Sequence, residues 1–257
     1  MTVPLTNSSK SHLLLIPSYN PGKLVISTVE DALVHWQPVW VVADGSDDGS
    51  TEVLQKMAEN TPHLKVIVMP CNMGKGSAIM TGLHQAKNEG FTHVLTMDAD
   101  GQHPAQLIPL FMQTSIQNPN AMILGKPVFD CSAPQLRVQG RKISNFLANL
   151  DTLWAGIGDS LYGFRVYPII PLLTIMQEHR FMRRFDFDIE AVVRLCWAKI
   201  PLINVDAPVK YLDAKDGGIS HFNYWRDNAL LTCMHIRLLF TFFFRLPVLV
   251  YRKYQRS

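Results

Sequence analysis

The segment HVLTMDAD at His93–Asp100 decides the fold prediction, because a short apolar run ends there in acidic residues. Three earlier segments have the same form, an apolar run followed by polar turn residues: Leu13–Pro17, Val39–Ala43 and Leu64–Met69. Such runs are typical of buried strands in a parallel sheet. Apolar residues recur at helical spacing in the intervening segments Lys23–Trp36, Ser50–Asn60 and Gly76–Glu89. The alternation predicts an α/β fold whose mostly parallel central sheet is flanked by helices.

The residues that follow the four strands are polar and turn-forming. They are Pro17–Pro21, Asp44–Ser50, Asn72–Gly76 and Asp98–His103. Ligands of such sheets bind beyond the carboxyl ends of the strands. We therefore expect the four loops to meet at one rim, where a metal ion, a lysine and backbone amides would hold an anionic ligand.

Asp98 and Asp100 are the most specific feature of that rim. A turn beginning at Ala99 can direct both carboxylates to one cation, with the Gln102 amide oxygen as a further ligand. Ligands that are all oxygen favour Mg²⁺ or Mn²⁺ over zinc. The alternative is structural, since Asp100 could cap a helix that begins near His103. The pair therefore predicts either a divalent metal site or a helix start.

The loop Asn72–Gly76 suits close approach to a diphosphate, with two glycines opening a helix and Lys75 as the counter-charge. It lacks the Walker A pattern, and Ile79 stands where the third glycine of a dinucleotide fingerprint belongs. Asp44 is placed either to contact a ribose or base or to serve as a turn residue. The acids of Asp47-Asp48 are expected to be turn and helix-capping residues.

Four motifs in this order are more specific than any one of them: IPSYN at 16–20, VVADGSDDGS at 41–50, NMGKG at 72–76 and MDADGQHP at 97–104. Together they resemble the family 2 glycosyltransferases, in particular the branch of dolichyl-phosphate mannosyl synthases and related bacterial membrane-associated enzymes. The similarity extends more loosely to about residue 220. It implies a GT-A fold and a metal-dependent, inverting transfer of a sugar from a nucleoside diphosphate sugar to a membrane-held acceptor, a polyprenyl phosphate or another lipid.

The resemblance assigns the donor site to residues of these motifs. Pro17 and Tyr19 would line the base pocket, and Asp44 would contact the nucleoside. Asp98 and Asp100 would hold the metal that bridges the sugar diphosphate. The other expected donor-site residues are Lys75, Ala99 and, as a further metal ligand, Gln102.

Three positions depart from the family pattern. Ala43 stands where the second strand usually ends in the first of two acids, and Pro21 stands where the mannosyl synthases carry a glutamate. Tyr162 replaces a small residue in DSLYGFR at 159–165 and is expected to reshape the pocket. The donor sugar and its nucleotide are therefore not carried over from the family.

The second half of the chain is expected to bind the acceptor. Arg141 and Ser144 resemble the arginine and serine that bind lipid phosphate in the mannosyl synthases, and Arg165 ends the matching DSLYGFR segment. Lys126 lies in GKP at 125–127, in the place of the family's Gly-Ser-Arg. On residue pattern alone, Arg141 could equally belong to a solvated helix face.

Asp188 is the candidate base, and together with Asp100 it forms the expected catalytic pair. The segment FDFDIEA at 185–191 resembles the acceptor segment of family 2 enzymes, in which an Asp acts as general base. Its acids could otherwise be partners of a helix dipole. A base is needed only for an alcohol acceptor, because a phosphate is already ionised and nucleophilic.

The region beyond residue 200 is expected to close over the site. A strand is predicted at Val209–Leu212, and the glycines of GGISH at 217–221 predict a mobile lid. Lys210 or Lys215 would then meet phosphate.

The C-terminal segment carries the charge imbalance of the chain. Residues 1–225 hold 18 Lys and Arg against 20 Asp and Glu, whereas residues 226–257 hold 6 against 1. At helical spacing Arg237, Thr241 and Arg245 form a narrow polar stripe opposite a wide Leu/Phe face, the pattern of a helix in a membrane interface. No run of about 18 uncharged apolar residues is present, so a transmembrane helix is not expected. The basic residues expected to meet anionic headgroups are Arg252, Lys253 and Arg256.

Composition and motif spacing exclude several classes of protein. With 257 residues, 47% of them hydrophobic and 18% charged, the chain has ample core and is not disordered. Its four cysteines lack CxxC spacing, which argues against a disulfide framework or a structural zinc site. No signal peptide is recognisable. We expect a catalytic domain at 1–225, made of a nucleotide-sugar half at about 11–125 and an acceptor half at about 126–225, followed by a membrane-associating tail at 226–257.

These features predict a cytoplasmic enzyme bound peripherally to the inner face of the cell membrane, with no nucleic-acid partner and with an oligomeric state that the sequence does not indicate. A sugar nucleotidyltransferase would share the core, but IPSYN lacks the Gly-rich basic loop expected after its first strand. A non-catalytic, membrane-recruited scaffold is favoured by Ala43 and opposed by the intact Asp98 and Asp100. The tail could instead be a core helix or a dimer face.

Overall fold

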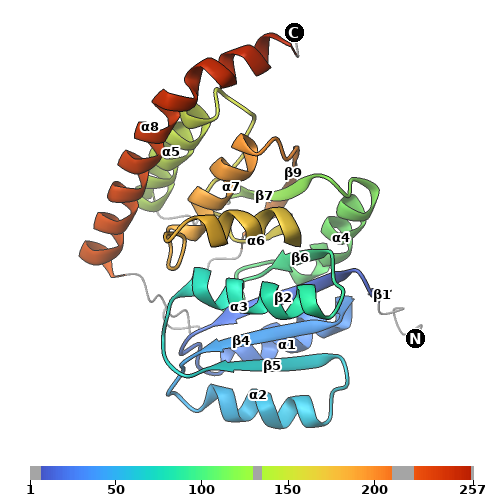
Figure 1. The fold of residues 1–257 in the computed structure, drawn as a ribbon. Coiled ribbons are helices and arrows are strands. Elements are labelled where there is room, and N and C mark those ends of the chain that lie inside the picture. Colours follow the sequence, from blue (N-terminus) through green and yellow to red (C-terminus); the bar gives the residue numbers. More distant parts are fainter. Residues whose placement is uncertain (1–6, 130–134, 210–222, 256–257) are drawn as a thin grey trace.

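A seven-stranded mixed sheet forms the centre of the molecule, in the order β5-β4-β2-β6-β8-β7-β9 (Figure 1). The structure, a computed structural model, describes residues 7–129, 135–209 and 223–255. Strand β8 runs antiparallel to both of its neighbours, and all other pairs in this sheet are parallel. The seven strands are β2 (His12–Ser18), β4 (Val39–Asp44), β5 (Leu64–Met69), β6 (His93–Thr96), β7 (Met122–Val128), β8 (Arg165–Pro168) and β9 (Leu202–Pro208). A separate pair consists of β1 (Asn7–Ser8) and β3 (Trp36–Gln37).

Helices cover both faces of the sheet, so that its strands are buried from two sides. One face carries α1 (Leu24–His35), α2 (Ser50–Glu59), the short 3₁₀ helix η1 (Ala105–Leu107) and α4 (Ile108–Gln117). The other carries α3 (Lys75–Asn88), α6 (Ile169–Glu178) and α7 (Phe187–Trp197). Beyond α7 lie α5 (Gln135–Asp151) and the C-terminal α8 (Tyr224–Tyr254), side by side (Figure 1). The predicted α/β architecture is confirmed.

The elements predicted for the first half agree with the structure to within two residues at each end. In α3, the residues expected to form one face are all buried: Ala78, Ile79, Gly82, Leu83 and Ala86. Strand β9 ends at Pro208, and residues 210–212 of the strand predicted at Val209–Leu212 lie outside the described residues. Strand β9 is the outer strand beside β7, and Asn204 and Asp206 interrupt its apolar pattern. Those polar residues hide the strand from a search for apolar runs.

Helix α8 packs against the body with one face and leaves the opposite apolar face exposed. Met234, Leu238 and Phe242 join the main hydrophobic core, whereas Phe240 and Phe244 are 66% and 72% exposed. By length and composition, Trp225–Tyr254 is sufficient to cross a membrane. Contrary to our expectation, composition therefore does not exclude a transmembrane helix. Helix α8 packs on α5 and α7, and 17% of its most apolar stretch is buried by the rest of the protein.

The polar stripe of α8 faces the body. Arg237 forms an ion pair with Glu190 of α7, a fully buried carboxylate that also pairs with Arg194. Arg245 lies with its guanidinium carbon 5.1 Å from the centre of the Trp197 ring. The polarity of α8 is therefore inverted relative to a surface helix in water, with charged groups turned inward and phenylalanines outward.

Candidate active site

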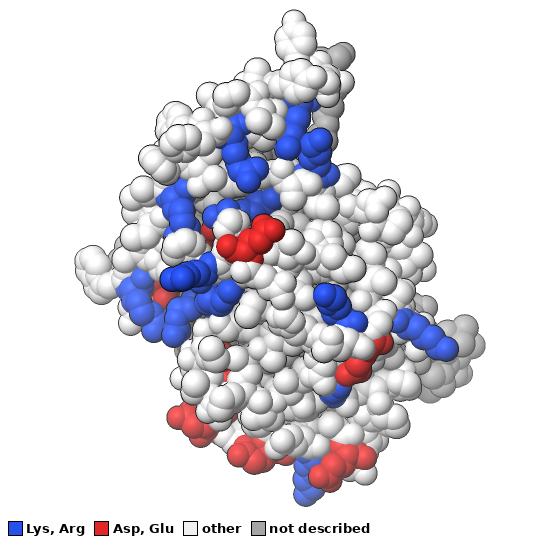
Figure 2. All heavy atoms as spheres, in the orientation of Figure 1, with Lys and Arg blue, Asp and Glu red and all other residues white. Residues whose placement is uncertain are grey.

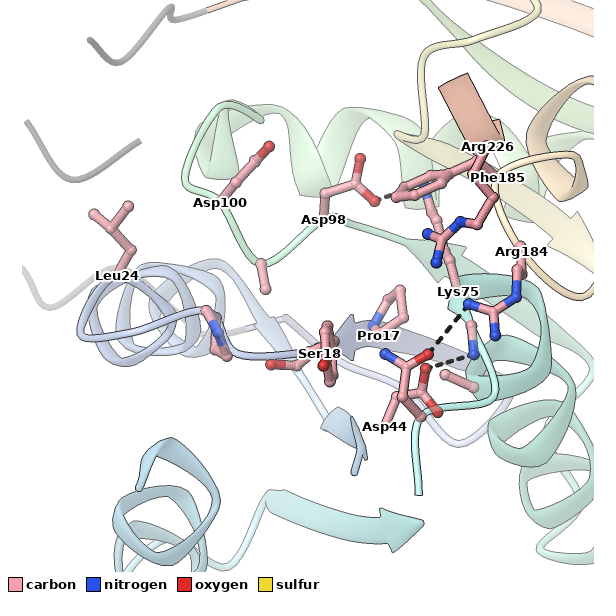
Figure 3. A pocket seen from close by; sticks show the side chains of 16 residues that line it. Pro17, Ser18, Leu24, Asp44, Lys75, Asp98, Asp100, Arg184, Phe185 and Arg226 are labelled. Carbon is pink, nitrogen blue, oxygen red and sulfur yellow. Dashed lines mark hydrogen bonds and ion pairs between the residues drawn. The ribbon is translucent and has the colours of Figure 1, made fainter. Parts of the chain in front are cut away.

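A cavity of about 520 Å³ lies at the carboxyl ends of β2, β4 and β6 (Figure 3). Its volume is in the range of small-molecule binding sites, about 300 to 1,000 Å³. All four polar loops reach it, as expected from the strand order. The residues expected to bind the donor that line the cavity are Pro17, Tyr19, Asp44, Lys75, Asp98, Ala99 and Asp100.

Lys75 joins the first acid of the metal motif to the candidate base. As the first residue of α3, it places its Nζ 2.7 Å from Asp98 Oδ1 and 2.9 Å from Asp188 Oδ2. Burial acts to lower the pKa of Lys75, but the carboxylates of Asp188 and Asp98 outweigh it and raise the pKa. The lysine therefore stays protonated and holds two carboxylates from opposite halves of the chain.

Two further residues fix the position of Asp98. A Cβ on Gly163 would lie 2.8 Å from Asp98 Oδ2 and from Lys75 Nζ, so a larger residue would displace the two side chains of this ion pair. His103 Nδ1 accepts a hydrogen bond from the Asp98 backbone N–H at 3.0 Å. Burial lowers the pKa of His103 to about 4, so its ring is neutral at physiological pH. The glycine of DSLYGFR and this histidine are therefore structural supports of the acidic motif.

Asp100 lines the cavity and its local structure is a turn. Its Oδ1 accepts the Gln102 backbone N–H at 3.1 Å, and neither η1 nor α4 has a side-chain N-cap. Burial, followed by the negative charge of Asp98, raises the pKa of Asp100 to about 6. An additional cation at this position would relieve that repulsion, so the two carboxylates fit Mg²⁺ or Mn²⁺. The Gln102 side chain does not line the cavity.

The protein alone supplies too few ligands to complete the coordination shell of a metal ion. Within the described ranges 7–129, 135–209 and 223–255, no group of three His, Cys, Asp or Glu residues gathers as a metal site. Mg²⁺ usually takes one or two protein carboxylates and completes its shell with water and substrate phosphate oxygens. Asp98 and Asp100 match that pattern, since both face a cavity large enough for a phosphorylated ligand.

Asp44 and the glycines of NMGKG organise protein loops. The Asp44 carboxylate accepts the backbone N–H groups of Met73 at 2.8 Å and Gly74 at 2.7 Å. A Cβ on Gly76 would lie 2.1 Å from the Met182 carbonyl oxygen. The glycine at 76 is therefore required for contact between α3 and the loop before α7, whereas Gly74 lines the cavity, so its closeness to a diphosphate stays a prediction. The expectation that Asp47 and Asp48 are turn residues is confirmed, since the Asp47 carboxylate accepts a hydrogen bond from the Asn20 side-chain amide and the Asp48 carboxylate accepts one from the Ser50 backbone N–H.

Arg165 does not line the cavity but stabilises the backbone next to it. Its side chain is fully buried and donates to the Tyr167 hydroxyl at 2.9 Å and to the backbone carbonyls of Asp188 and Asp159. In this position it cannot contact a ligand phosphate. It fixes the first turn of α7, from which Asp188 meets Lys75.

The other expected acceptor residues also lie outside the cavity. Arg141 forms an ion pair of 2.6 Å with the buried Asp159, and Lys126 lies 3.5 Å from Asp206. The Ser144 hydroxyl lies 3.3 Å from His235 Nε2, between α5 and α8. Direct binding of lipid phosphate by these three residues stays a prediction. Arg141 is more than a solvated helix residue, because it holds the loop that begins at Asp159.

Contrary to our expectation, Tyr162 does not line the cavity. It is buried beside His103, with the ring centres 4.7 Å apart, and a Cβ on Gly125 would lie 2.6 Å from its ring. The missing side chain at Gly125 therefore makes room for this tyrosine. The expected lid at 217–221, with Lys210 and Lys215, lies outside the described residues, as does Arg256.

Two arginines and a phenylalanine line the cavity without having been predicted: Arg184, Phe185 and Arg226. Figure 3 shows the three side chains on the side of the cavity away from Leu24 and Asp100. The pair Arg183-Arg184 before FDFDIEA was a usable signal, since basic residues directly precede the expected acceptor segment. Arg226 has no local signal, because α8 brings it to the site from more than 120 residues beyond Asp100.

Comparison with known proteins agrees with this geometry. The family model of glycosyl transferase family 2 matches residues 14–186, which include all four motifs and Lys75. A UDP-N-acetylglucosamine–dolichyl-phosphate N-acetylglucosaminyltransferase of Methanococcus voltae is 25% identical over 214 residues, covering 77% of this chain and 84% of its own. An undecaprenyl-phosphate mannosyltransferase of Micrococcus luteus is 23% identical over 220 residues, covering 80% and 85%.

Solved structures share the fold. Glucosyl-3-phosphoglycerate synthase of Mycobacterium tuberculosis, in complex with Mn²⁺, UDP and glucosyl-3-phosphoglycerate, superposes with a TM-score of 0.60. The match covers 89% of this chain and 77% of that one at 14% sequence identity. A mixed sheet that ends in an acidic motif at one rim, with the motifs in family order, is the GT-A arrangement. The chain belongs to glycosyl transferase family 2 and is a glycosyltransferase.

Proposed function

We propose that this enzyme transfers a sugar from a nucleoside diphosphate sugar to a polyprenyl phosphate held in a membrane. One observation carries the proposal: α8 contributes Arg226 to the cavity and exposes an apolar face along its following turns. At 1.5 Å per residue its 31 residues extend about 46 Å. The same helix thus joins the site of an anionic ligand to a surface suited to lipid.

The donor side of the cavity is supported by residues from four strand ends. Tyr19 and Pro17 lie beside Asp44, which suits a base and ribose, and Asp98 and Asp100 face the same space. We propose that these two carboxylates hold Mg²⁺ or Mn²⁺, in agreement with the Mn²⁺ and UDP present in the solved relative. The bound ion would neutralise negative charge on the diphosphate.

The acceptor side is supported by Arg184 and Arg226. Arg184 is half-buried and donates to the Asn72 side-chain oxygen at 3.3 Å. Arg226 is paired with Asp227, yet its side chain is 57% exposed beside the cavity. Arginine binds phosphate with several donors at once. Both residues are therefore placed to receive the phosphate of a lipid whose chain follows α8.

The reaction can then proceed without a protein base. A phosphate oxygen of the acceptor attacks the anomeric carbon of the sugar, from the face opposite the leaving group, while the bond between that carbon and the diphosphate oxygen breaks. The electron pair of that bond leaves with the nucleoside diphosphate. No proton moves, because the acceptor phosphate is already ionised.

Asp188 acts as a positioning residue in this proposal. Its Oδ2 accepts a hydrogen bond from the Lys75 ammonium, which is held protonated, so one of its two carboxylate oxygens is engaged by the lysine. Asp188 thus keeps Lys75 beside Asp98, at the edge of the donor site.

Membrane attachment is supported by two neighbouring helices. Helix α5 exposes Ile143 and Phe146, at 64% and 57%, and α8 exposes Phe240, Phe243 and Phe244. Clusters of large apolar side chains on a protein surface mark interaction sites. We propose that α5 and α8 rest in the headgroup region of the inner leaflet, which makes the enzyme a peripheral protein of the cytoplasmic face.

A panel of radiolabelled nucleotide sugars tests the function. Each sugar is incubated with the enzyme, Mn²⁺ and a membrane extract, and label is counted in the organic phase. We expect one sugar to enter the lipid fraction and the Asp100→Asn variant to lose at least about 100-fold in rate. Release of the label by mild acid would identify a phosphodiester-linked sugar. Label found only in water-soluble products would contradict the proposal.

A further inference from the structure

The loop between α6 and α7, residues 179–186, contacts two parts of the molecule with different roles. On one side it meets the first turn of α3, where Lys75 faces the donor cavity. On the other side it meets α8, the helix that we assign to the membrane. These two parts bind different substrates in the proposed function. The loop is therefore a place where donor binding and the position of α8 can influence each other.

Backbone groups of the loop hold the first turn of α3. The Ser77 N–H is one of the first four of this helix, which have no partner inside it. It donates instead to the Arg183 carbonyl oxygen at 3.0 Å. A Cβ on Gly74 would lie 2.6 Å from the same carbonyl oxygen. The loop thus packs directly on the turn that places Lys75 at the cavity.

The same loop also borders the cavity. The Arg184 side chain lines the cavity and donates to the Asn72 side-chain oxygen at 3.3 Å. Asn72 lines the cavity as well and begins the NMGKG segment. The loop therefore contacts this segment at its start through Arg184, and farther along it through the carbonyl groups of Met182 and Arg183.

Asp186 fixes the conformation of the loop. This buried residue accepts the N–H groups of Met182 at 3.0 Å and of Arg184 at 2.9 Å, one with each carboxylate oxygen. Met182 has a φ of 63°, which is costly for a residue other than glycine, and its buried side chain joins the main core. Because its residues are bound together, a displacement at Phe181 reaches the carbonyl group of Arg183.

Phe181 connects the loop to α8. The guanidinium carbon of Arg237 lies 3.5 Å from the centre of the Phe181 ring, within the range of a cation–π contact. Arg237 also forms an ion pair with the buried Glu190, which fixes the arginine over the ring. Phe181 is 45% exposed, so it lacks the close packing on all sides that holds a ring in the core. Contact with α8 therefore restrains this side chain.

The backbone of the loop is joined to α6 within a basic part of the molecule. Figure 2 shows Lys and Arg side chains gathered over the half that contains α7 and α8, whereas acidic ones gather at the opposite end around α2. In the loop, the Arg183 guanidinium donates to the carbonyl oxygens of Phe181 and Met176, at 2.8 Å each. The backbone at Phe181 is thus held by α6, and its ring is held by α8.

We propose that residues 181–184 form a positioning loop through which α8 keeps the donor site in order. With Arg237 docked on Phe181, the loop holds the first turn of α3, and Lys75 stays at the cavity. Without this contact the turn loosens, and a nucleoside diphosphate binds more weakly. The proposal rests on the proposed function for the identity of the donor. Phe181 and Arg237 are positioning residues, since neither lines the cavity.

Hydrogen exchange at the Ser77 amide tests the loop in the absence of donor, acceptor and membrane. Phe181→Leu keeps an apolar side chain but removes the ring face, whereas Phe181→Tyr keeps the ring face. Substitutions along a path of coupled contacts change the coupling by a factor of about 2 to 30. We expect Ser77 to exchange about tenfold faster in Phe181→Leu, and within about twofold of the wild type in Phe181→Tyr.

Two controls separate the loop from general stability. The Val39 amide donates to the His63 carbonyl oxygen at 2.9 Å, at the opposite rim of the sheet, and its exchange should change less than about twofold in every variant. Leu110→Ala, in α4 on the other face of the sheet, truncates a side chain of similar exposure, 48%. It should change Ser77 exchange less than about twofold. Equal acceleration of Ser77 and Val39 in Phe181→Leu would overturn the proposal.

A double variant tests whether Phe181 acts through α8. Arg237→Met removes the cation from the ring and should accelerate Ser77 exchange as Phe181→Leu does. If the two residues act through one contact, Phe181→Leu/Arg237→Met exchanges no faster at Ser77 than the faster single variant. Accelerations that multiply in the double variant would show two independent effects and would contradict a loop that acts through α8.

Donor affinity is the functional readout. The binding of UDP, GDP, CDP and dTDP, each with Mn²⁺, is measured by calorimetry, and the nucleotide that the wild type binds most tightly is used for the variants. Phe181→Leu should weaken its binding about tenfold, and Phe181→Tyr less than about twofold. Faster Ser77 exchange in Phe181→Leu with unchanged nucleotide binding would show that the loop is structural only, and would overturn the proposal.

The outcomes distinguish this proposal from the proposed function. If sugar is transferred to lipid while Phe181→Leu binds its nucleotide normally, only the positioning loop is wrong. If the wild type binds none of the four nucleotides, the proposed donor is wrong, and the positioning of the donor fails with it. Weaker nucleotide binding in Phe181→Leu, without sugar transfer to lipid by the wild type, would uphold the positioning loop alone.

Discussion

Helices α3 and α8 both send a basic residue from their first turn into the same cavity, but their remaining faces are opposite in character. Lys75 begins α3, whose apolar residues point to the core and whose exposed residues include Lys87. Arg226 lies near the start of α8, which turns Arg237 inward and Phe240 outward. The first pattern is that of a helix between a protein core and water. The second is the pattern that led us to propose a membrane surface beside α8.

The largest effect is expected at Lys75. In Lys75→Met, the buried carboxylate of Asp188 and the partly exposed carboxylate of Asp98 lose their shared cation, and removing one partner of a buried ion pair costs about 3 kcal/mol. Urea denaturation should show this loss in the free energy of unfolding, together with a large fall in transferase rate. Lys87→Met, at the other end of α3, is the matched control and should change stability by less than about 0.5 kcal/mol. Similar stabilities in the two variants would show that the ion pair does not support the fold.

A smaller loss is expected when α8 is detached from α7. In Arg237→Met, Glu190 keeps Arg194 as a partner but loses the ion pair that joins the two helices. We expect a loss of about 2 kcal/mol in the free energy of unfolding, less than for Lys75 because one partner remains. Limited proteolysis should cleave the variant within α8 faster than the wild type. An unchanged cleavage rate would mean that the inward polar stripe does not hold the helix.

The region beside α8 also contains a buried carboxylate with the opposite effect on stability. Neither oxygen of Asp151 has a hydrogen-bond partner within the described part of the chain, and burial raises its pKa to about 7. Because the unfolded chain ionises near pH 4, the folded state loses stability from this group as the pH rises from about 4 to 7. Asp151→Asn should therefore raise stability by about 1 kcal/mol at pH 8 and leave it unchanged below pH 4.

Urea denaturation at several pH values measures the difference between Asp151→Asn and the wild type. A stabilisation that grows with pH between 5 and 8 would confirm the sign. A variant that is less stable than the wild type at pH 8 would show that the carboxylate is ionised in the folded protein and favourably placed. At the other end of the molecule, Asp44 and Asp98 have donors for their carboxylates, so the same substitution there should destabilise.

The smallest change in stability, with a large change in binding, is expected on the outer face of α8. Phe244→Ser should change the free energy of unfolding by less than about 0.5 kcal/mol, since the ring is 72% exposed. Binding to vesicles should fall about tenfold, because one phenylalanine contributes about 1.5 kcal/mol when it enters an apolar phase. Phe242→Ser, two residues earlier, should instead destabilise by about 3 kcal/mol, because it is in the core. A stability loss in Phe244→Ser with a binding loss in Phe242→Ser would show that the face of α8 containing Phe244 does not meet the membrane.

The donor half of the site could be predicted because its residues follow strands directly. Asp98 and Tyr19 end apolar runs, and a parallel sheet brings such ends together. The arrangement of the acceptor half could not be predicted, because it depends on contacts between distant segments. Arg165 is of a residue type that commonly binds phosphate, yet it is fully buried and donates to the Asp188 carbonyl oxygen. Arg226 reaches the cavity through the packing of α8, which leaves no signal in the local sequence.

The polarity of α8 was visible in the sequence, but its orientation was not. Helical spacing identifies a narrow stripe that contains Arg237 and a wide apolar face, whichever side meets the body. The orientation of α8 is set by the buried Glu190, which forms an ion pair with Arg237 of the polar stripe. That glutamate is 47 residues away from Arg237, on another helix, and so only the folded chain shows the pairing.

Transfer in defined vesicles shows whether the acceptor is a membrane-held phosphate. Phosphatidylcholine and phosphatidylglycerol vesicles carry either a polyprenyl phosphate or the corresponding polyprenol, and the active nucleotide sugar is supplied with Mn²⁺. If Arg184 and Arg226 receive a membrane-held phosphate and no protein base is needed, label enters the lipid only in the vesicles with polyprenyl phosphate. Equal transfer to the polyprenol, or transfer only to water-soluble acceptors, would contradict the account.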